Sequence, residues 1–258
     1  MNSVSDSGDG RSALITGAAS GIGLCTARVF LQHNWSVAIA DSDAEEGAKA
    51  STELAQLGRV FFVPCDVSQP EDVRRAVGAS IAAFGRINVL VNNAAMLGPG
   101  DLLESSDLEL ARVLAVDLFG PLCASKYMIE HMVKAGEGLI INVASIASFI
   151  GAPAYPAYGA SKAGLIGLTK SLARRYARNN VRINCVCPGS VRDTKLTFRS
   201  RNRDYTTTEK LALAARIPIG RSLRPQEVAD LIFFLTSPAA AAMTGAAIVL
   251  DGGEMLGQ

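Results

Sequence analysis

Residues 12–33, SALITGAASGIGLCTARVFLQH, carry three structural signals in succession. Ser12–Thr16 reads as a short apolar strand, the run from Gly17 to Gly23 as a glycine-rich turn, and the remainder to about His33 as a helix. Glycines let a backbone approach a phosphate closely, and a helix N-terminus offers free N–H groups and the positive end of its dipole. The stretch predicts a phosphate-binding unit, although the spacing is G-x3-G-x-G and a glycine cluster alone can be only a tight turn.

The second predicted strand adds a carboxylate to this unit. Ser36–Ala40 is apolar and runs into Asp41, eighteen residues after Gly23. A carboxylate at the end of the second strand accepts hydrogen bonds from a ribose and repels a 2′-phosphate. This context favours a dinucleotide. An alternative interpretation, that Asp41 caps the next helix, does not exclude ribose binding.

Strands and helices alternate through the rest of the chain. Further strands are expected over Arg59–Val63, Ile87–Val91, Leu139–Val143, Val181–Val186 and Ala247–Leu250. Helices are expected over Asp43–Leu57, Pro70–Phe84, Ser106–Ala135 with a bend at Gly120-Pro121, from near Tyr158 to about Arg178, and over Glu227–Leu235. This order predicts an α/β protein with one doubly wound parallel sheet of about seven strands and helices on both faces. Residues 1–10 form a flexible tail in this interpretation and residues 11–258 a single domain.

The polar and glycine motifs fall where the predicted strands end. In a parallel sheet the carboxyl ends meet at one edge, and ligands bind outside that edge. The motifs therefore predict one ligand site, contributed by Gly17, Asp41, Asp66, Asn93, Ser145 and Gly189.

Composition excludes several other classes of protein. The chain has 258 residues, of which 19% are charged and 49% hydrophobic, with a net charge of +1, so nothing favours disorder, a nucleic-acid partner or a membrane surface. The five cysteines lack metal-site spacing, and buried free thiols in a reducing cytoplasm are expected. The polar N-terminus does not resemble a signal peptide, and no stretch approaches about 20 apolar residues.

A second motif could move protons. Tyr158 and Lys162 are four residues apart and therefore share a helix face, and Ser145 lies thirteen residues before the tyrosine. A phenol has a pKa near 10, which a neighbouring cation lowers, so the pair could act as an acid or base on a carbonyl or alcohol oxygen held by the serine. A solvated helix face is the alternative interpretation of the pair alone.

Together these motifs resemble the short-chain dehydrogenase/reductase family over roughly Ser12 to Gly253. The resemblance rests on five motifs in order: TGAASGIG at 16–23, Asp66-Val67, NNAA at 92–95, Ser145 with Tyr158 and Lys162, and PGSVRDT at 188–194. It implies a Rossmann-like fold, with Tyr158 as general acid/base, Ser145 orienting the substrate oxygen, and Lys162 binding the nicotinamide ribose and lowering the tyrosine pKa.

The same resemblance implies the cofactor site. Asp66 and Val67 would flank the adenine, Asn93 and Ala94 the adenosine ribose, and Val191 and Thr194 the nicotinamide carboxamide. The other cofactor-binding residues would be Gly17, Ser20, Gly21, Ile22, Gly23, Asp41, Tyr158, Lys162, Pro188 and Gly189. Family members that use NADPH usually carry a basic residue where this chain has Ser20 or Ser42, so the expected cofactor is NAD.

Asp117 departs from the family pattern, which has an asparagine at this position. In the family that residue contributes largely through its main-chain carbonyl, and a backbone role survives the change to aspartate. We expect this backbone role, so that Asp117→Asn would shift the pH profile by less than about half a unit. Two alternatives remain open: the carboxylate supports the charge of Lys162, or it makes a hydrogen bond within the helix and has no catalytic effect.

By analogy, an apolar substrate pocket is expected. Its wall would be formed by Met96, Leu97, Ile146, the range Phe149–Tyr155 and the segment after Gly189. Within it, Met96, Ile146 and Tyr155 are the specific substrate-site candidates. Residues 192–216 would form a mobile lid, in which Arg199, Arg201 and Arg203 either bind an anionic substrate or, as we prefer, face solvent.

The predicted activity is hydride transfer between NAD(H) and a small secondary alcohol or ketone by a cytoplasmic enzyme without metal. A biosynthetic NAD(P)H-dependent carbonyl reductase is the alternative, and a non-catalytic dinucleotide-binding regulator is a weaker one. Small residues on the Tyr158 helix and an apolar C-terminal segment fit the homotetramers that the family habitually forms.

Overall fold

The computed structural model describes residues 10–192, 194, 196 and 206–257. The expected flexible tail therefore lies outside the described residues, apart from Gly10. The expected lid lies partly outside them, and Arg199, Arg201 and Arg203 are among the residues that are not described.

Seven parallel strands form one sheet in the order β3-β2-β1-β4-β5-β6-β7. The strands are β1 (Ser12–Thr16), β2 (Ser36–Asp41), β3 (Val60–Pro64), β4 (Val89–Asn92), β5 (Gly138–Val143), β6 (Val181–Pro188) and β7 (Ala247–Leu250). The central strands read as continuous apolar runs because helices cover both faces of the sheet. The predicted doubly wound parallel sheet is confirmed.

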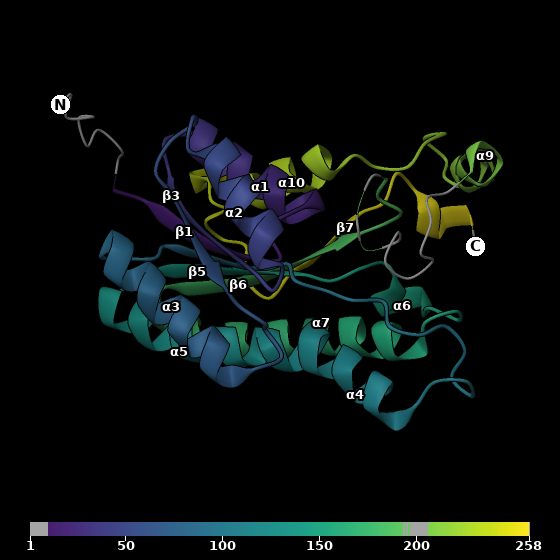
Figure 1. Ribbon diagram of the computed structural model, residues 1–258, viewed down its shortest axis with the longest axis horizontal. Helices are drawn as coiled ribbons and strands as arrows, with labels where there is room; N and C mark the ends of the chain where they lie inside the picture. Colours follow the sequence, from purple (N-terminus) through teal and green to yellow (C-terminus); the bar gives the residue numbers. More distant parts are fainter. Residues whose placement is uncertain (1–9, 193, 195, 197–205, 258) are drawn as a thin grey trace.

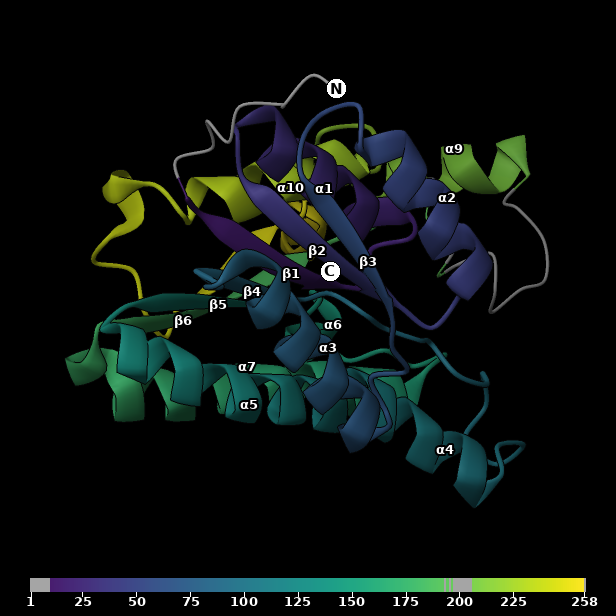
Figure 2. The same ribbon diagram turned by 60° about the vertical axis from the view of Figure 1, so that its left-hand side comes forward.

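Helices lie in two layers, one on each face of the sheet (Figure 1). On one face lie α1 (Gly21–Gln32), α2 (Ala44–Leu54) and α10 (Pro225–Phe234), as the turned view also shows (Figure 2). On the other face lie α3 (Pro70–Phe84), α4 (Asp107–Leu114), α5 (Gly120–Ala135) and α7 (Pro156–Tyr176). Two short helices, α6 (Ala147–Ile150) and α9 (Thr207–Ala215), lie beyond the carboxyl ends of the strands (Figure 1).

The chain reverses its direction of winding between β1 and β4, which are paired neighbours although two strands separate them in sequence. Ala13 pairs with Val89 and Ile15 with Val91, so the carboxyl ends of both strands lie at the same level. Such a switch point is where open α/β sheets bind ligands. The site is therefore expected at the edge marked by the C-terminus and α6 in Figure 1.

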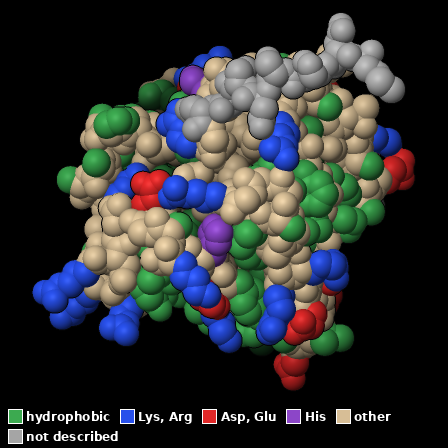
Figure 3. All heavy atoms as spheres, turned by 90° about the vertical axis from the view of Figure 1, so that its left-hand side faces the viewer, with side chains coloured by type: hydrophobic (Ala, Val, Ile, Leu, Met, Phe, Trp, Pro, Cys, Tyr) green, Lys and Arg blue, Asp and Glu red, His purple; other side chains and the backbone are tan. Residues whose placement is uncertain are grey.

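The opposite end of the molecule, where the strands begin, carries no comparable concentration of functional motifs. Figure 3 views this end and shows lysine and arginine side chains spread over it among hydrophobic ones. The basic side chains of the described residues in this view are therefore dispersed and not gathered into one patch.

Several helix ends follow the expected rules. Pro70 lies in the first turn of α3, where its missing N–H is harmless, and Gly85 ends the helix with a φ of 73°. At α4, Ser106 and Glu109 form a reciprocal capping box. These local signals explain why the bounds of α3 agree with the sequence prediction.

The long helix expected over residues 106–135 is interrupted earlier than predicted. A π-helical turn, Ala115–Phe119, separates α4 from α5, whereas Pro121 lies in the first turn of α5. Proline is tolerated in a first turn, so it does not create the irregularity there. A π turn is an insertion into a helix and occurs frequently at functional sites. Here it contains Asp117.

The expectation of free thiols is confirmed for the structure described. All five cysteines are unpaired, and four of them are buried, while Cys25 is half-buried.

Candidate active site

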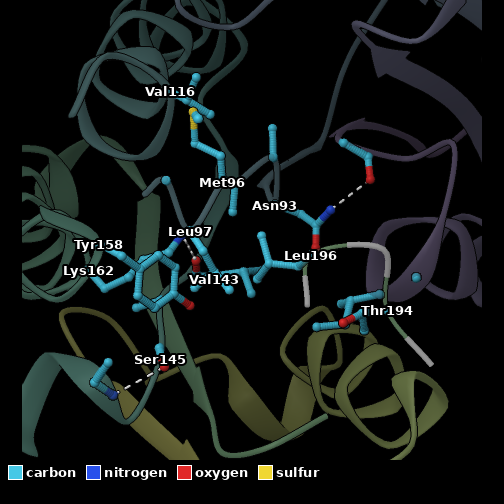
Figure 4. Close-up of a pocket in the computed structure, with 18 of the residues that line it drawn as sticks. Asn93, Met96, Leu97, Val116, Val143, Ser145, Tyr158, Lys162, Thr194 and Leu196 are labelled. Carbon is cyan, nitrogen blue, oxygen red and sulfur yellow. Dashed lines mark hydrogen bonds between the residues drawn. The ribbon is translucent and has the colours of Figure 1, made fainter. Parts of the chain in front are cut away.

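One large cavity opens at the carboxyl edge of the sheet, with a volume of about 1110 Å³. It extends from the glycine-rich turn after β1 to Ser145, Tyr158 and Lys162 at the other end (Figure 4). All the predicted catalytic and cofactor-binding residues line this cavity except Gly23 and Asp117. Of the specific substrate-site candidates, Met96 and Ile146 line it and Tyr155 does not, and of the expected wall Phe149–Tyr155 only Ile150 and Gly151 do. Residues separated by up to 177 positions are thus brought into one site.

The glycine-rich turn is packed too closely for larger residues. Gly17 has a φ of +65°, and a Cβ there would lie 2.7 Å from the Cα of Ala94. A Cβ on Gly23 would lie 2.3 Å from the carbonyl oxygen of Gly17. Gly23 is therefore a packing residue beneath the turn and not a cavity-lining one.

A threonine that the sequence analysis did not single out holds this turn in place. The Thr16 hydroxyl oxygen accepts hydrogen bonds from the backbone N–H groups of Asn93 (3.0 Å) and Ala94 (3.2 Å). The Asn93 side-chain amide donates to the carbonyl oxygens of Thr16 and Gly17, both at 2.9 Å. Asn93 thus uses its amide to join the ends of β1 and β4, and it still borders the cavity (Figure 4).

Asp41 lies at the cavity edge and does not cap α2. Its carboxylate accepts the backbone N–H of Ala19 at 3.0 Å and that of Asp43 at 3.1 Å. The N-cap of α2 is Asp43, whose side chain accepts the N–H of Glu46. The capping interpretation of Asp41 is therefore wrong, and its carboxylate is anchored beside the glycine-rich turn.

At the same end of the cavity, Asp66 is paired with an arginine that the sequence analysis missed. Arg112, from α4, donates to Asp66 at 2.6 Å and also binds the Ser68 hydroxyl. Burial alone would raise the pKa of Asp66, but the hydrogen bonds from Arg112 and Ser68 outweigh burial and hold the pKa below its usual range. Asp66 is therefore a carboxylate at neutral pH.

These features fit a nicotinamide dinucleotide. Ser20 is the N-cap of α1, makes no side-chain capping bond, and borders the cavity together with Gly21 and Ile22, so the first turn of the helix faces the cavity. This is the arrangement that binds a pyrophosphate. Asp41 and Asp66 then offer acceptors for hydroxyl and amino groups further along the same cavity.

At the other end of the cavity, Tyr158 and Lys162 project from one face of α7, as expected for residues four apart (Figure 4). The Lys162 ammonium lies 5.5 Å from the centre of the Tyr158 ring and donates to the carbonyl oxygen of Val143 at 3.1 Å. Ser145 follows β5 and accepts the backbone N–H of Ala147 at 3.1 Å. The predicted serine, tyrosine and lysine therefore meet at one place.

Asp117 reaches this group from below the cavity surface. Its Oδ2 atom lies 3.2 Å from the Lys162 Nζ, and its Oδ1 atom accepts the backbone N–H of Met96 at 2.8 Å. The side chains of Asp117 and Lys162 are 0% and 3% exposed. The Oδ2 contact is an ion pair without hydrogen-bond geometry. Because the carboxylate contacts Lys162 and Met96, the interpretation of a bond within the helix is wrong.

The buried pair affects all three ionisable groups. Burial raises the pKa of Asp117, and Lys162 and the Met96 N–H only partly oppose it. Burial by itself would lower the pKa of Lys162, but Asp117 and Tyr158 outweigh it and raise the pKa. The raised pKa of Asp117 favours a neutral carboxyl group, whereas the raised pKa of Lys162 favours a charged ammonium. We assign both side chains as ionised, because the carboxylate has a cation and an N–H donor as partners.

Burial and the Asp117 charge raise the pKa of Tyr158, while Lys162 and the Ser145 hydroxyl lower it less. The expected lowering of the tyrosine pKa by Lys162 is thus opposed by Asp117. In this protein the positive charge of Lys162 is therefore largely balanced by the negative charge of Asp117.

The remaining wall of the cavity is largely apolar. Met96, Leu97, Ile146 and Leu196 border it, and Figure 4 shows Leu97 beside Tyr158. Tyr155 does not line the cavity: it is the N-cap of α7, so the expectation that it contacts substrate is not supported. In the described ranges no group of His, Cys, Asp or Glu side chains is arranged to hold a metal ion. Among those same residues, no helix has the length and apolar character needed to cross a membrane.

The fold and this site define a class of protein: an α/β oxidoreductase that binds a nicotinamide dinucleotide. A family model described as enoyl-(acyl carrier protein) reductase matches residues 17–254. The chain belongs to the short-chain dehydrogenase/reductase family. It is thus an oxidoreductase of alcohols or ketones that uses a nicotinamide dinucleotide.

Relatives of the chain include both dehydrogenases and reductases. It is 38% identical over 246 residues to cis-4-hydroxycyclohexanecarboxylate dehydrogenase of Sinomonas cyclohexanicum, covering 94% of this chain and 96% of that protein. The crystal structure of levodione reductase superposes with a TM-score of 0.90 at 26% identity, covering 96% of this chain and 99% of that one. The 3-ketoacyl-(acyl-carrier-protein) reductase of Brucella melitensis complexed with NADH has a TM-score of 0.86 at 31% identity, with the same coverage.

Proposed function

We propose that this protein transfers a hydride between NAD(H) and a small secondary alcohol or ketone, with Tyr158 as the general acid/base. The observation that supports the proposal is the single cavity, which joins the glycine-rich turn and Asp41 at one end to Ser145, Tyr158 and Lys162 at the other. A non-catalytic regulator would have no use for three proton-handling side chains at the end of a cofactor site.

The nicotinamide ring, when bound, would accept the hydride of an alcohol or supply one to a ketone. The protein would do the rest. Ser145 holds the substrate oxygen, and Tyr158 takes the hydroxyl proton in oxidation or returns it in reduction. Lys162 keeps a positive charge beside the phenol and would also reach the nicotinamide ribose. Asp117 holds Lys162 in place through the 3.2 Å contact.

The apolar wall formed by Met96, Leu97, Ile146 and Leu196 favours a substrate with a hydrocarbon body. The relative from Sinomonas cyclohexanicum is named for a cyclic secondary alcohol, which fits such a wall. We therefore propose a cyclic secondary alcohol, or the ketone derived from it, as the substrate class.

A panel of cyclic alcohols, steroids, polyols and hydroxy acids, followed by NADH absorbance, tests this proposal. Turnover of cyclic secondary alcohols with NAD is expected. If the protein oxidises none of these alcohols but reduces ketones strongly with NADPH, the carbonyl-reductase alternative is favoured. The similarity to two reductase structures supports that alternative.

Cofactor choice gives a separate prediction. Because the Asp41 carboxylate is anchored at the cavity edge, it would repel a 2′-phosphate, and we expect kcat/KM to favour NAD over NADP by at least about tenfold. Asp41→Ala should reduce this preference to a few-fold. Asp43→Asn, which keeps the α2 cap and removes a charge two residues away, is the matched control and should keep it. Equal use of both cofactors by the unmodified protein would contradict the assignment.

The expected homotetramer remains a proposal. The outer face of α7 exposes Ala160, Ala163 and Gly167, and a Cβ on Gly167 would meet nothing within 4 Å. Leu256, in the C-terminal segment, is 87% exposed. Pairing of these surfaces in a second copy would cover them. Analytical ultracentrifugation should show about four times the chain mass of 27.0 kDa, and a monomer at micromolar concentration would contradict the proposal.

A further inference from the structure

The turn after β7 lies against the segment that follows β6. Glu254 from this turn binds one residue, Ser190, through both carboxylate oxygens: Oε2 accepts the backbone N–H and Oε1 accepts the hydroxyl, each at 2.8 Å. Hydrogen bonds to a carboxylate are stronger than those between neutral groups. Glu254 therefore fastens the C-terminal turn to the segment that begins at Gly189.

The turn is built to hold Glu254 in this position. The Asp251 carboxylate accepts the N–H groups of Gly253 at 2.8 Å and Met255 at 2.9 Å. Gly252 and Gly253 have φ values of +64° and +86°, which favour glycine. The Asp251-Gly252-Gly253 sequence thus fixes the direction in which the Glu254 side chain projects.

The segment after β6 is held on its other side as well. The carbonyl oxygen of Ser190 accepts the N–H of Leu223 at 2.9 Å, and the N–H of Arg192 donates to the carbonyl oxygen of Leu223 at 2.9 Å. A Cβ on Gly189 would lie 2.7 Å from Glu254 Oε2, so the approach of the two segments requires a glycine there. Ser190 is consequently clamped between Leu223 and Glu254.

This clamp lies at the cavity. Ser190, Val191, Thr194 and Glu254 all border it. Under the proposed function, to which this inference is tied, Val191 and Thr194 would hold the nicotinamide carboxamide. We propose that Glu254 is a positioning residue for the nicotinamide end of the cofactor, acting through Ser190 on the segment that carries Val191 and Thr194.

Binding of two ligands separates this role from general stabilisation. NADH contains the nicotinamide, whereas ADP-ribose is the same molecule without it. Glu254→Ala removes both bonds to Ser190 and should raise the dissociation constant of NADH about tenfold, because part of the free energy of these two charged hydrogen bonds is lost from nicotinamide binding. The dissociation constant of ADP-ribose should stay within about twofold. Glu254→Gln, which can still bond to Ser190 through its amide, should recover most of the NADH affinity.

Glu227→Ala is the matched control. Glu227 also accepts a backbone N–H, that of Arg224 at 2.8 Å, and pairs with Arg221, but it does not border the cavity. This variant should lower the unfolding temperature and leave both dissociation constants unchanged.

Isothermal titration calorimetry of wild type, Glu254→Ala, Glu254→Gln and Glu227→Ala with NADH and with ADP-ribose tests this role of Glu254. The inference is overturned if Glu254→Ala binds NADH as tightly as wild type, or if it loses affinity for NADH and ADP-ribose in parallel. Failure of the wild type to bind NADH would overturn the proposed function as well, and the two results are distinguishable.

Discussion

Tyr158→Phe is expected to lower kcat by about 10²–10⁴-fold, the range for loss of a general acid/base. The change removes only the phenolic oxygen, and in the described part of the site Tyr158 is the hydroxyl-bearing side chain that lies beside the Lys162 ammonium. The glycine-rich turn, Asp41 and Asp66 are untouched. The dissociation constant of NADH should therefore stay within about threefold of wild type, since a substitution that leaves the main binding contacts in place usually has a small energetic effect.

Tyr155→Phe is the matched control, since Tyr155 lies three residues earlier at the start of the same helix and does not line the cavity. It should retain wild-type kcat. Residual activity of Tyr158→Phe within tenfold of wild type, measured in steady-state kinetics with the same alcohol, would rule out the assigned role.

Asp117→Asn should move the pH profile of alcohol oxidation to lower pH. The direction of this shift follows from the net charge of the three buried side chains Asp117, Tyr158 and Lys162. With Asp117 and Lys162 ionised and Tyr158 protonated the net charge is zero, so loss of a proton leaves −1 on a group of buried side chains. With asparagine the same loss takes the group from +1 to zero, which burial favours. The macroscopic pKa of the group falls in either case, whichever side chain gives up the proton.

Because the basic form of Tyr158 is active in oxidation, the rising limb of kcat against pH should shift down by about one to two units, the usual effect of a charge a few ångströms away. If Lys162 gives up part of this proton, less of Tyr158 is in its basic form and the maximal kcat is lower. The rising limb of kcat against pH still does not move to higher pH. Asp107→Asn, on the exposed first turn of α4, should leave the profile unchanged. An Asp117→Asn profile within half a unit of wild type, or displaced to higher pH, would contradict this account.

This expectation replaces the one drawn from the sequence, where a backbone role for Asp117 predicted almost no shift. The sequence identified Asp117 as a departure from the family pattern, but not the direction of its side chain. That direction depends on the π turn over Ala115–Phe119, which arises within a continuous helical pattern that contains no break before Gly120. Periodicity alone cannot reveal such an insertion.

Local chemistry made much of the fold predictable. Apolar runs such as Ser12–Thr16 and Ala247–Leu250 are strands with the expected bounds, and Pro70 and Gly85 mark the ends of α3. The position of the site followed from the rule that parallel strands end at one edge. Boundaries shifted by a few residues where propensity was weak, as at α2, which ends at Leu54 and not at Leu57.

The missed residues share a different property: their roles depend on partners far away in the chain. Arg112 binds Asp66 across 46 positions, and Glu254 binds Ser190 across 64. Thr16 supports Asn93 across 77. An arginine in a helix or a glutamate after two glycines has no local signal for such a partner, because only the sheet order brings them together.

Transfer of deuterium is the decisive measurement for the proposed reaction. A cyclic secondary alcohol that the substrate panel identifies is deuterated at its carbinol carbon and incubated with NAD and the wild-type protein, with Tyr158→Phe alongside. Mass spectrometry of the reduced nucleotide should find one deuterium per NADH formed by the wild type, and almost no NADH formed by Tyr158→Phe. NADH without deuterium, or equal NADH from both proteins, would contradict hydride transfer at this site.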